Sequence, residues 1–336
     1  MNVNRRESNF ECLRIVAMLM ILNLHSFVGQ GSLKMSDING FVFFDYLRES
    51  FSICAVNCFV LISGYWGIIW KRKSLLNLIF QVYFYVIGFF FILVFLGYTD
   101  FSIGKMLSRL NCLLVSYWFI SAYLVLYLLS PLLNNFTGSK NMHRFIVVYF
   151  LVQTYFSLIG PKYFNDCLNF VGLYLIGRFI KIYPQSKILK ISKEYDLILY
   201  ICLSILICIV ALAQKILTDD GNPAFSLFCG VYSNPLVVLQ SLFLFLFFLK
   251  VSIKNNFINW CGASALSVYL IHLSPDLKYY YLNFCRNLYT YNGLYHYLIL
   301  LFFIPIVFFV CILIDKFRIL LWNHFYISIE SKFKFK

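Results

Sequence analysis

The stretch ECLRIVAMLMILNLH, residues 11–25, decides the class of fold. With its flanks it forms a mostly apolar segment, residues 10–29, which is long enough to cross the roughly 30 Å hydrocarbon core of a bilayer as one helix. The segment nevertheless holds Glu11, Arg14 and His25, and ionisable groups inside a membrane are costly and usually functional. The sequence therefore predicts a membrane-spanning helix that carries part of a functional site.

The rest of the chain has the composition of a membrane protein. Of its 336 residues 61% are hydrophobic and only 12% are charged, whereas a soluble domain carries about 25% charged residues. We expect an all-α, polytopic membrane protein of about ten transmembrane helices, folded as a single domain over residues 1–336 without an appended soluble domain. After the first, the expected spans are residues 51–70, 75–97, 112–133, 145–160, 167–182, 196–216, 229–249, 257–273 and 295–315.

The distribution of Lys and Arg predicts how these helices are oriented. Basic residues gather in alternate connections, which include Arg5–Arg6, Lys71–Lys73 and the tail that begins at Lys316. Because connections rich in Lys and Arg stay on the cytoplasmic side, both termini should be cytoplasmic. The longest connections, residues 31–50 and 274–294, should then lie outside. The basic and aromatic tail has the composition of a segment that lies on the anionic inner leaflet.

Composition also argues against several functions. The net charge of +14 could indicate a nucleic-acid partner, but none is expected, because the basic residues sit in the short connections between apolar runs. Most of the 11 cysteines lie inside apolar runs, without a CxxC pair or a zinc-like Cys/His spacing, so we expect small buried hydrophobes and no metal. Arg5 and Arg6 before an apolar run resemble a signal peptide, but no cleavage site is evident and a first span is expected instead.

Arg14 and His25 share a face of the first helix. At 100° per residue the eleven steps between them close three turns to within about 20°, and they separate the two residues by about 16 Å along the axis. Glu11 lies three residues before Arg14, where the two side chains can pair. Each residue alone has an ordinary explanation, Arg14 as an arginine that snorkels to the interface and His25 as a histidine hydrogen-bonded between helices. Their common face favours one site that includes both.

Several motifs resemble the acyltransferase family 3 membrane enzymes. The first helix of that family carries Arg or Lys, then ten residues, then His, as Arg14 and His25 do here. Glu11 stands where Asp is more usual in the family, which keeps the charge. The resemblance covers essentially the whole chain. The later fragments, in the family's order, are Val56–Tyr65 with its ending Ser63-Gly64-Tyr65, the basic cluster Lys71-Arg72-Lys73, Trp118-Phe119-Ile120, and Ser267–His272.

The resemblance implies transfer of an acyl group, usually acetyl, from cytoplasmic acyl-CoA to a hydroxyl of a cell-surface or exported glycan. His25 would be the general base that deprotonates this hydroxyl. Arg14, oriented by Glu11, would line the donor channel. The cluster Lys71–Lys73 would hold the anionic CoA nucleotide, unless it only anchors the chain on the positive side. A bacterial cytoplasmic membrane is the expected location, with the bilayer and the glycan as partners.

Four further residues are candidates for substrate contacts, each with a structural alternative. Ser63 and Tyr65 could bind substrate or only pack helices around Gly64. Trp118 could stack on a sugar or belong to the aromatic belt at the membrane interface. His272, at the outer end of its span, could contact the acceptor or only end the helix.

The main alternative function is a polytopic transporter or a flippase of a lipid-linked glycan. Such proteins commonly show repeated halves and helices interrupted by Gly or Pro at matching positions, and neither pattern is evident in the sequence. A non-catalytic sensor or scaffold gives no reason for Arg14 and His25 to share a face. The resemblance therefore favours an acyltransferase. The acceptor, the acyl group, the oligomeric state and the choice between direct transfer and an acyl-enzyme stay open.

Overall fold

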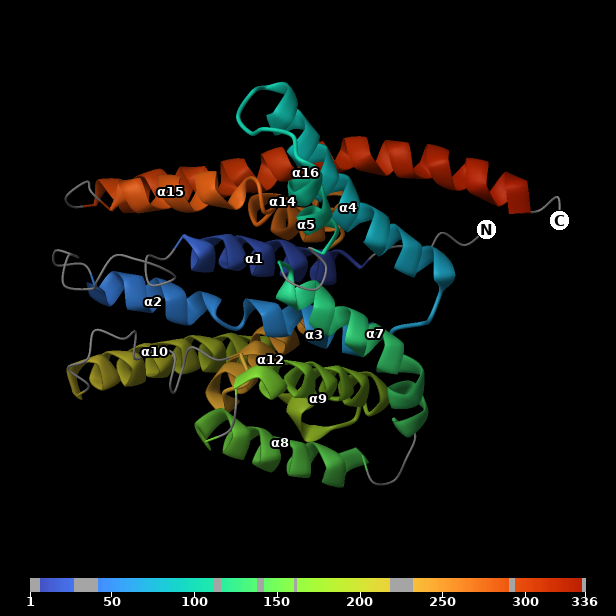
Figure 1. Ribbon diagram of the computed structural model, residues 1–336. Helices are drawn as coiled ribbons and strands as arrows, with labels where there is room; N and C mark the ends of the chain where they lie inside the picture. Colours follow the sequence, from blue (N-terminus) through green and yellow to red (C-terminus); the bar gives the residue numbers. More distant parts are fainter. Residues whose placement is uncertain are drawn as a thin grey trace.

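The computed structural model describes residues 7–26, 42–111, 116–137, 142–159, 162–217, 232–289 and 294–333. Within these ranges every regular element is a helix, and most helices run alongside one another in a bundle (Figure 1). The prediction of an all-α chain is confirmed. The elements in chain order are α1 (Ser8–His25), α2 (Val42–Ser52), α3 (Ala55–Trp66), α4 (Arg72–Phe95), α5 (Ile103–Leu110), α7 (Trp118–Phe136), α8 (Met142–Ile159), α9 (Lys162–Ile182), η3 (Lys187–Lys190), α10 (Lys193–Leu217), α12 (Pro235–Lys250), α13 (Asn256–Gly262), α14 (Ala265–His272), α15 (Lys278–Leu288) and α16 (Tyr295–Phe333).

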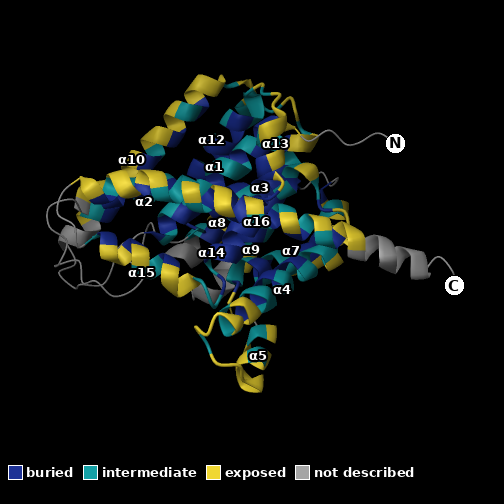
Figure 2. Cartoon of the chain, turned by 90° about the horizontal axis from the view of Figure 1, so that it is seen from above, coloured by how far each residue is buried: buried dark blue, intermediate teal, exposed yellow. Residues whose placement is uncertain are grey.

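Helix α1 lies inside the bundle rather than at its edge. It packs against α3, α12, α13 and α14, and it also contacts α2 and α16. Its residues Leu13, Ala17 and Leu22 are completely buried. Figure 2 shows the buried residues concentrated toward the middle of the bundle, while α10 and α5 at its edge expose many of theirs. The ionisable residues of α1 are therefore surrounded mainly by protein.

Helices α3 and α9 approach each other closely because each has a glycine, without a side chain, against the backbone of the other helix where the two cross. A Cβ atom added to Gly64 would lie 2.3 Å from the backbone oxygen of Tyr174, and one added to Gly177 would lie 2.5 Å from that of Leu61. Small residues let helix backbones come together in membranes, where packing drives association. The two glycines thus bring the carboxyl-terminal turns of α3 and α9 side by side.

Five helical stretches within the described ranges are long and apolar enough to cross a membrane. The helix α12 is apolar but shorter. The expected number of ten crossings and the sides of the termini stay predictions, although each expected segment is helical over most of its described residues. The five stretches are Phe43–Trp66, Arg72–Phe95, Trp118–Phe136, Lys193–Ala213 and Tyr295–His324.

The second expected span begins earlier than its hydropathy predicts. Helix α2 starts at Val42, inside the segment 31–50 that the charge pattern assigns to an external connection. Together α2 and α3 form the stretch Phe43–Trp66. The boundary at residue 51 was wrong because charged residues interrupt the apolar pattern, and these are paired. Asp45 is 1% exposed, and its carboxylate lies 3.3 Å from the guanidinium of Arg48.

The expected span 257–273 is broken in the middle. Helix α13 ends at Gly262 and α14 begins at Ala265. Lys316 Nζ donates to the backbone oxygen of Trp260 at 2.6 Å and to Ser264 Oγ at 2.9 Å, so polar groups at the break keep a partner. Breaks inside membrane proteins are tolerated when a neighbouring helix satisfies the freed groups. The sequence predicts one span over residues 257–273 without this break, because mean hydropathy does not detect a break of this kind.

Helix α16 continues well past residue 315, where the sequence predicts the last span to end. It reaches Phe333 and includes Pro305. Its length of about 58 Å, at 1.5 Å per residue, exceeds the thickness of the hydrocarbon core. The basic tail therefore begins as a continuation of this helix. The amino end of α1 and the carboxyl end of α16 lie at the same end of the bundle (Figure 1).

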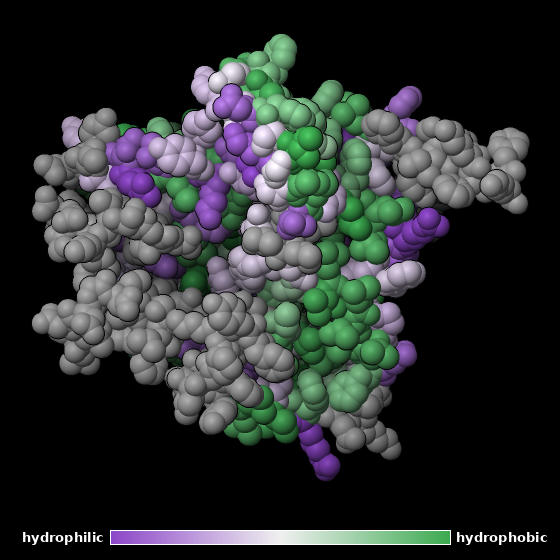
Figure 3. All heavy atoms as spheres, in the orientation of Figure 1, coloured by the Kyte–Doolittle hydropathy of each residue, from purple (hydrophilic) through white to green (hydrophobic). Residues whose placement is uncertain are grey.

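The outer surface of the bundle suits a lipid environment. Figure 3 shows hydrophobic residues gathered over the face that carries α4 and α7, with hydrophilic residues toward its edges. The described cysteines form no disulfide. Cys58, Cys208 and Cys311 are buried, as their positions in apolar runs predict, whereas Cys202 is exposed on α10 and Cys12 is partly buried.

Candidate active site

A wide cavity opens beside the amino-terminal half of α1. Its volume is about 700 Å³, and its wall is formed by α1, α3, α4, α7 and the residues around the α13–α14 break. Binding cavities of this size combine apolar walls with a few polar groups that orient the ligand. The polar lining residues are Glu7, Glu11, Arg14, Ser63, Ser74, Asn77, Gln81, Tyr123 and Tyr127.

A narrow cavity adjoins the wide one nearer the carboxyl end of α1. Its volume is about 20 Å³, so it has room for little more than one water-sized group. Phe59, Phe119 and Leu266 line both cavities. His25 and Trp118 also line the narrow cavity, and the remaining wall is apolar or aromatic. These three side chains lie between the two cavities, and we call the route from the wide cavity past them to His25 the path.

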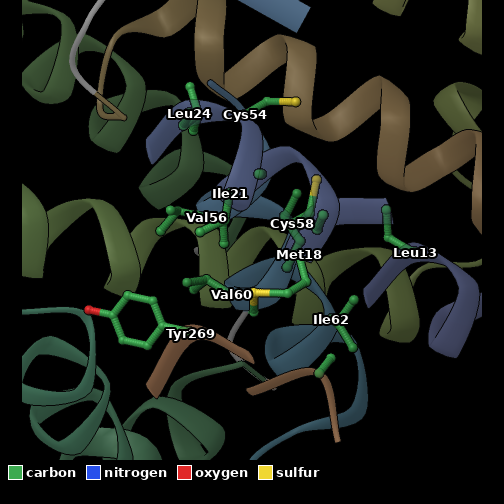
Figure 4. Close-up of a cluster of buried hydrophobic side chains, with 14 of the residues drawn as sticks. Leu13, Met18, Ile21, Leu24, Cys54, Val56, Cys58, Val60, Ile62 and Tyr269 are labelled. Atoms are coloured by element: carbon green, nitrogen blue, oxygen red, sulfur yellow. The ribbon is translucent and has the colours of Figure 1, made fainter. Parts of the chain in front are cut away.

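One stripe of α1 follows this path. Arg14 lines the wide cavity, and Met18, Ile21 and His25 line the narrow one. Their spacing of four, three and four residues is that of a single helix face. Figure 4 shows Met18 and Ile21 projecting among side chains of α3, including Val56. The structure therefore places Arg14 and His25 on a common face, as their spacing predicts.

A buried carboxylate fixes Arg14 on the cavity wall. Arg14 Nη1 lies 2.5 Å from Glu11 Oε1, and the side chain of Glu11 is 3% exposed. Gly262 makes room for Glu11, because an added Cβ atom would lie 2.4 Å from Glu11 Oε2. The pair sits where α13 meets α1. A guanidinium held in this way is preorganised for an anionic or carbonyl group of a ligand.

His25 is hydrogen-bonded to His272 of α14. His25 Nδ1 lies 2.8 Å from His272 Nε2, and His272 Nδ1 lies 2.5 Å from the backbone oxygen of Val268. A carbonyl oxygen only accepts, so in the neutral pair His272 carries its hydrogen on Nδ1 and its Nε2 accepts from His25 Nδ1–H. The lone pair of His25 is then on Nε2. This chain of bonds selects the tautomer in which His25 Nε2 can take a proton.

His272 is held firmly against His25. It is 3% exposed, and the ring of Tyr281 packs edge-on against it at 5.3 Å. Tyr281 Oη donates to the backbone oxygen of Leu22 at 2.6 Å, which ties α15 to α1 at the level of the pair. The sequence proposes His272 for contact with the acceptor. The structure shows its ring nitrogens bonded to His25 and Val268.

The basic cluster Lys71–Lys73 follows a loop that neighbouring side chains clamp. The amide of Ile68 donates to Tyr174 Oη, and Asn134 Nδ2 donates to the carbonyl of Ile68, both at 2.9 Å. Tyr127 Oη bonds the backbone amide and carbonyl of the first residue of the cluster, at 2.8 and 2.9 Å. Tyr127 also lines the wide cavity. The cluster is exposed beside the cavity, although its side chains do not form the cavity wall.

Two further basic residues, Arg178 and Lys181 of α9, lie beside the same loop. Gly67 has a φ of 75°, and a Cβ atom added there would lie 2.7 Å from a guanidinium nitrogen of Arg178. Lys181 Nζ lies 4.6 Å from the ring centre of Tyr65 and 5.0 Å from that of Trp66, which lines the wide cavity. Sequence reasoning treated both residues only as part of the charge pattern. Gly67, just after α3, is the one local feature of the sequence that indicates the close approach of Arg178 to this loop.

The remaining candidates lie at different distances from the path. Ser63 lines the wide cavity and donates its hydroxyl to the backbone oxygen of Phe59 at 2.9 Å. Trp118 lines the narrow cavity and stacks on Tyr232, with ring centres 5.3 Å apart. Tyr65 lines neither cavity and contacts Lys181 instead. Substrate contacts of these residues stay predictions.

The two ends of the path differ in chemistry. The wide end carries Arg14 on its wall and the basic residues beside it, which suits an anionic ligand. The narrow end carries a histidine nitrogen that can accept a proton. Within the described ranges no group of three or more His, Cys, Asp or Glu residues could hold a metal ion. The arrangement can therefore hold a charged molecule at one end and promote proton transfer at the other.

Comparison with known proteins agrees with this chemistry. The family model described as the acyltransferase domain of acyltransferase family 3 matches residues 7–316. No curated protein and no solved structure matches the chain. The matched residues include α1 through the first part of α16, and so both cavities. The chain belongs to acyltransferase family 3.

Proposed function

We propose that this membrane acyltransferase moves an acyl group, most simply acetyl, from cytoplasmic acyl-CoA to a hydroxyl of a cell-surface or exported glycan. The observation that carries the proposal is the path from Arg14 to His25, wide and polar at one end and narrow at the other. This shape fits a donor with an anionic head, a long thin arm and a small acyl group. The helical rise places the two residues about 16 Å apart, which an extended arm can bridge.

The proposed reaction is a direct transfer. As the acceptor oxygen attacks the carbonyl carbon of the thioester, His25 Nε2 takes the proton of the hydroxyl. The tetrahedral intermediate then expels the CoA thiolate by breaking the C–S bond, and the thiolate takes the proton back from His25. The products are an ester and CoA with a free thiol. Throughout the step His272 holds the ring by accepting from Nδ1–H, as the third group of a catalytic triad does.

The nucleotide of the donor would bind at the wide end. The clamped loop presents the cluster Lys71–Lys73, and Arg178 and Lys181 add charge from α9. Arg and Lys side chains bind phosphate through charge-assisted hydrogen bonds. Arg14, held by Glu11, lies on the cavity wall and would contact the arm or the phosphates.

The acceptor would approach His25 from the other side of the membrane. By the charge pattern the wide end is cytoplasmic, so the His25 end faces outward in a bacterial cytoplasmic membrane. Trp118 on the wall of the narrow cavity is the aromatic residue best placed to stack on a sugar. The narrow cavity, about 20 Å³, favours an acetyl group over a long acyl chain.

A transporter or glycan flippase is the second candidate function. Its support is that the described chain contains a broken helix between Gly262 and Ala265, a feature of many transporters. Family membership argues against it, because the family model that matches the chain describes an acyltransferase domain.

Purified protein in lipid nanodiscs with radiolabelled acetyl-CoA tests the proposal. The wild type should hydrolyse the thioester or transfer acetyl to a glycan. His25→Ala should lower the rate by about 100-fold or more, the contribution of a general base, and Arg14→Ala should also lose activity. His143→Ala and Arg144→Ala remove the same side chains from exposed sites on α8 and should keep the wild-type rate.

Thermal unfolding of each variant separates lost activity from lost structure. A folded His25→Ala protein with the wild-type rate would remove His25 from the reaction. A wild type that neither binds nor turns over acyl-CoA would end the acyltransferase proposal, and transport of a lipid-linked glycan would be measured next.

A further inference from the structure

A buried charge network beside the wide cavity has no part in the proposed proton transfer. Asp315 and Arg318 of α16 are 0% and 4% exposed, and Arg318 Nε donates to Asp315 Oδ1 at 2.6 Å. Tyr85 Oη of α4 donates to the same oxygen at 2.5 Å. A buried ion pair is expensive in a membrane protein and usually has a function.

The network ends on the wall of the wide cavity. Arg318 Nη1 donates to Oδ1 of Asn77 at 3.3 Å, and Asn77 lines the cavity. One helical turn further along α4, Gln81 Nε2 donates to Ser267 Oγ of α14 at 2.7 Å. Gln81 also lines the cavity and is 7% exposed. Each amide side chain is therefore held at one end by protein.

The remaining polar atoms of the two side-chain amides are one donor and one acceptor. A guanidinium only donates, so the atom that Arg318 meets is the oxygen of Asn77, and Nδ2 remains as a donor. On Gln81 the oxygen Oε1 remains as an acceptor. Neither atom has a hydrogen-bond partner in the part of the chain that the structure describes. Both residues line the cavity, so a ligand there can donate an N–H to Gln81 Oε1 and accept from Asn77 Nδ2.

We propose that Asn77 and Gln81 bind the two amide groups of the pantetheine arm of a thioester donor, an inference that rests on the proposed function. Asn77 Nδ2 donates to the carbonyl of one amide, and Gln81 Oε1 accepts from the N–H of the other. The four helical steps from Asn77 to Gln81 rise about 6 Å along α4. A peptide advances about 3.5 Å per residue, and the extra methylene between the arm's two amides extends this to about 5 Å.

The order of groups along the path supports this assignment. The cluster Lys71–Lys73 precedes Asn77 on α4, and Gln81 bonds Ser267, the neighbour of Leu266. Leu266 lines both cavities, so the path continues from there to His25. The nucleotide of the donor thus lies at the basic cluster, its amide arm at Asn77 and Gln81, and its thioester at His25.

Asp315 and Arg318 are positioning residues on this assignment. They act on the donor only through Asn77, whose oxygen they occupy so that its N–H groups stay available. Without Arg318 the side-chain amide of Asn77 could rotate and present either atom.

Two small donors without a nucleotide test the inference in the full chain in nanodiscs. S-acetylpantetheine carries both amides, and S-acetyl-2-mercaptoethanol carries neither. The variant with Asn77→Leu and Gln81→Met should lower kcat/KM for S-acetylpantetheine about 30-fold, the combined effect of two hydrogen bonds, and leave it unchanged for S-acetyl-2-mercaptoethanol. Gln240→Met, which removes a fully buried glutamine between α12, α2 and α10, should leave the ratio of the two values unchanged.

Each outcome decides the inference. If kcat/KM falls equally for both donors, or does not fall for either, the ratio of the two values is unchanged and the inference is overturned. If the double variant does not fold, Asn77→Asp keeps a partner for Arg318, loses the N–H donor and should lower the ratio about 5-fold. If the wild type turns over neither these thioesters nor acetyl-CoA, the proposed function fails, and binding of free pantetheine is compared instead. Weaker binding to Asn77→Asp than to wild type supports the amide site, and equal binding overturns it.

Discussion

His25 has two ring nitrogens, and its neighbour decides which one carries the hydrogen. His272 Nε2 accepts a hydrogen bond from His25 Nδ1–H at 2.8 Å, and the lone pair of the His25 ring is therefore on its Nε2. In His272→Leu this acceptor is gone, so both tautomers are populated and the ring can turn. We expect kcat for acetyl transfer to fall by roughly tenfold or more, with little change in the KM of the donor. Steady-state kinetics in nanodiscs measures both constants.

A conservative variant separates the hydrogen bond from packing. His272→Gln keeps an acceptor oxygen and should recover part of the lost rate, whereas His272→Leu keeps only bulk. Equal loss in both variants at equal thermal stability would show that His272 fills space and does not set the tautomer.

Periodicity within one helix is enough to place Arg14 and His25 on a common face, because each helical residue turns the chain by a fixed angle. The same reasoning cannot place His272, which is 247 residues away from His25 in the chain. Contact between such distant residues depends on how the whole bundle packs. The position of Arg178 could not be predicted for the same reason, because its guanidinium packs against Gly67, which lies far away in the chain.

At the scale of helices, the crossing of α3 and α9 holds the wide end of the path together. A Cβ atom at Gly64 would lie 2.3 Å from the backbone oxygen of Tyr174, and a backbone cannot move aside as a flexible side chain does. We expect Gly64→Ala to lower the melting temperature by several degrees, because overpacking costs about 1–3 kcal/mol. Arg178 and Lys181 would move with α9, so the KM of acyl-CoA should also rise. Thermal unfolding and donor kinetics check the two effects.

Gly88 of α4 provides the matched control. A Cβ atom added there meets nothing within 4 Å. Alanine favours a helix over glycine by about 1 kcal/mol, so Gly88→Ala should leave stability unchanged or raise it. A Gly64→Ala protein as stable as Gly88→Ala would contradict a tight crossing.

Helices that hold long apolar runs could be predicted closely from the sequence. The segments 75–97 and 196–216 correspond to α4 (Arg72–Phe95) and α10 (Lys193–Leu217). The start of α2 and the break before Ala265 could not, because distant groups satisfy their polar atoms. Asp45 pairs with Arg48 and bonds Tyr289, and Lys316 of α16 bonds the residues around the break.

For the whole molecule, charge divides the two ends of the path. The wide end lies next to the clamped cluster Lys71–Lys73 and the basic residues Arg178 and Lys181. At the other end Arg109 is neutralised by Asp276, which lies 2.6 Å away and four residues beyond His272. Because the more basic side of a membrane protein stays in the cytoplasm, the path should take its donor from that side. A charged thioester such as acetyl-CoA does not cross a bilayer, so the side on which it is supplied matters.

Sealed proteoliposomes therefore test the direction of the path. An impermeant maleimide added outside labels Lys73→Cys only in molecules whose wide end faces outward, and Lys278→Cys only in those of opposite orientation, after subtraction of the label on the unsubstituted chain. With acetyl-CoA outside, thioester turnover should scale with the accessible fraction of Lys73→Cys. Turnover that scales with the accessible fraction of Lys278→Cys would mean that the donor enters beside His25. The narrow cavity would then have to admit the whole pantetheine arm. Its volume of about 20 Å³ does not allow this without a rearrangement of α1 and α14.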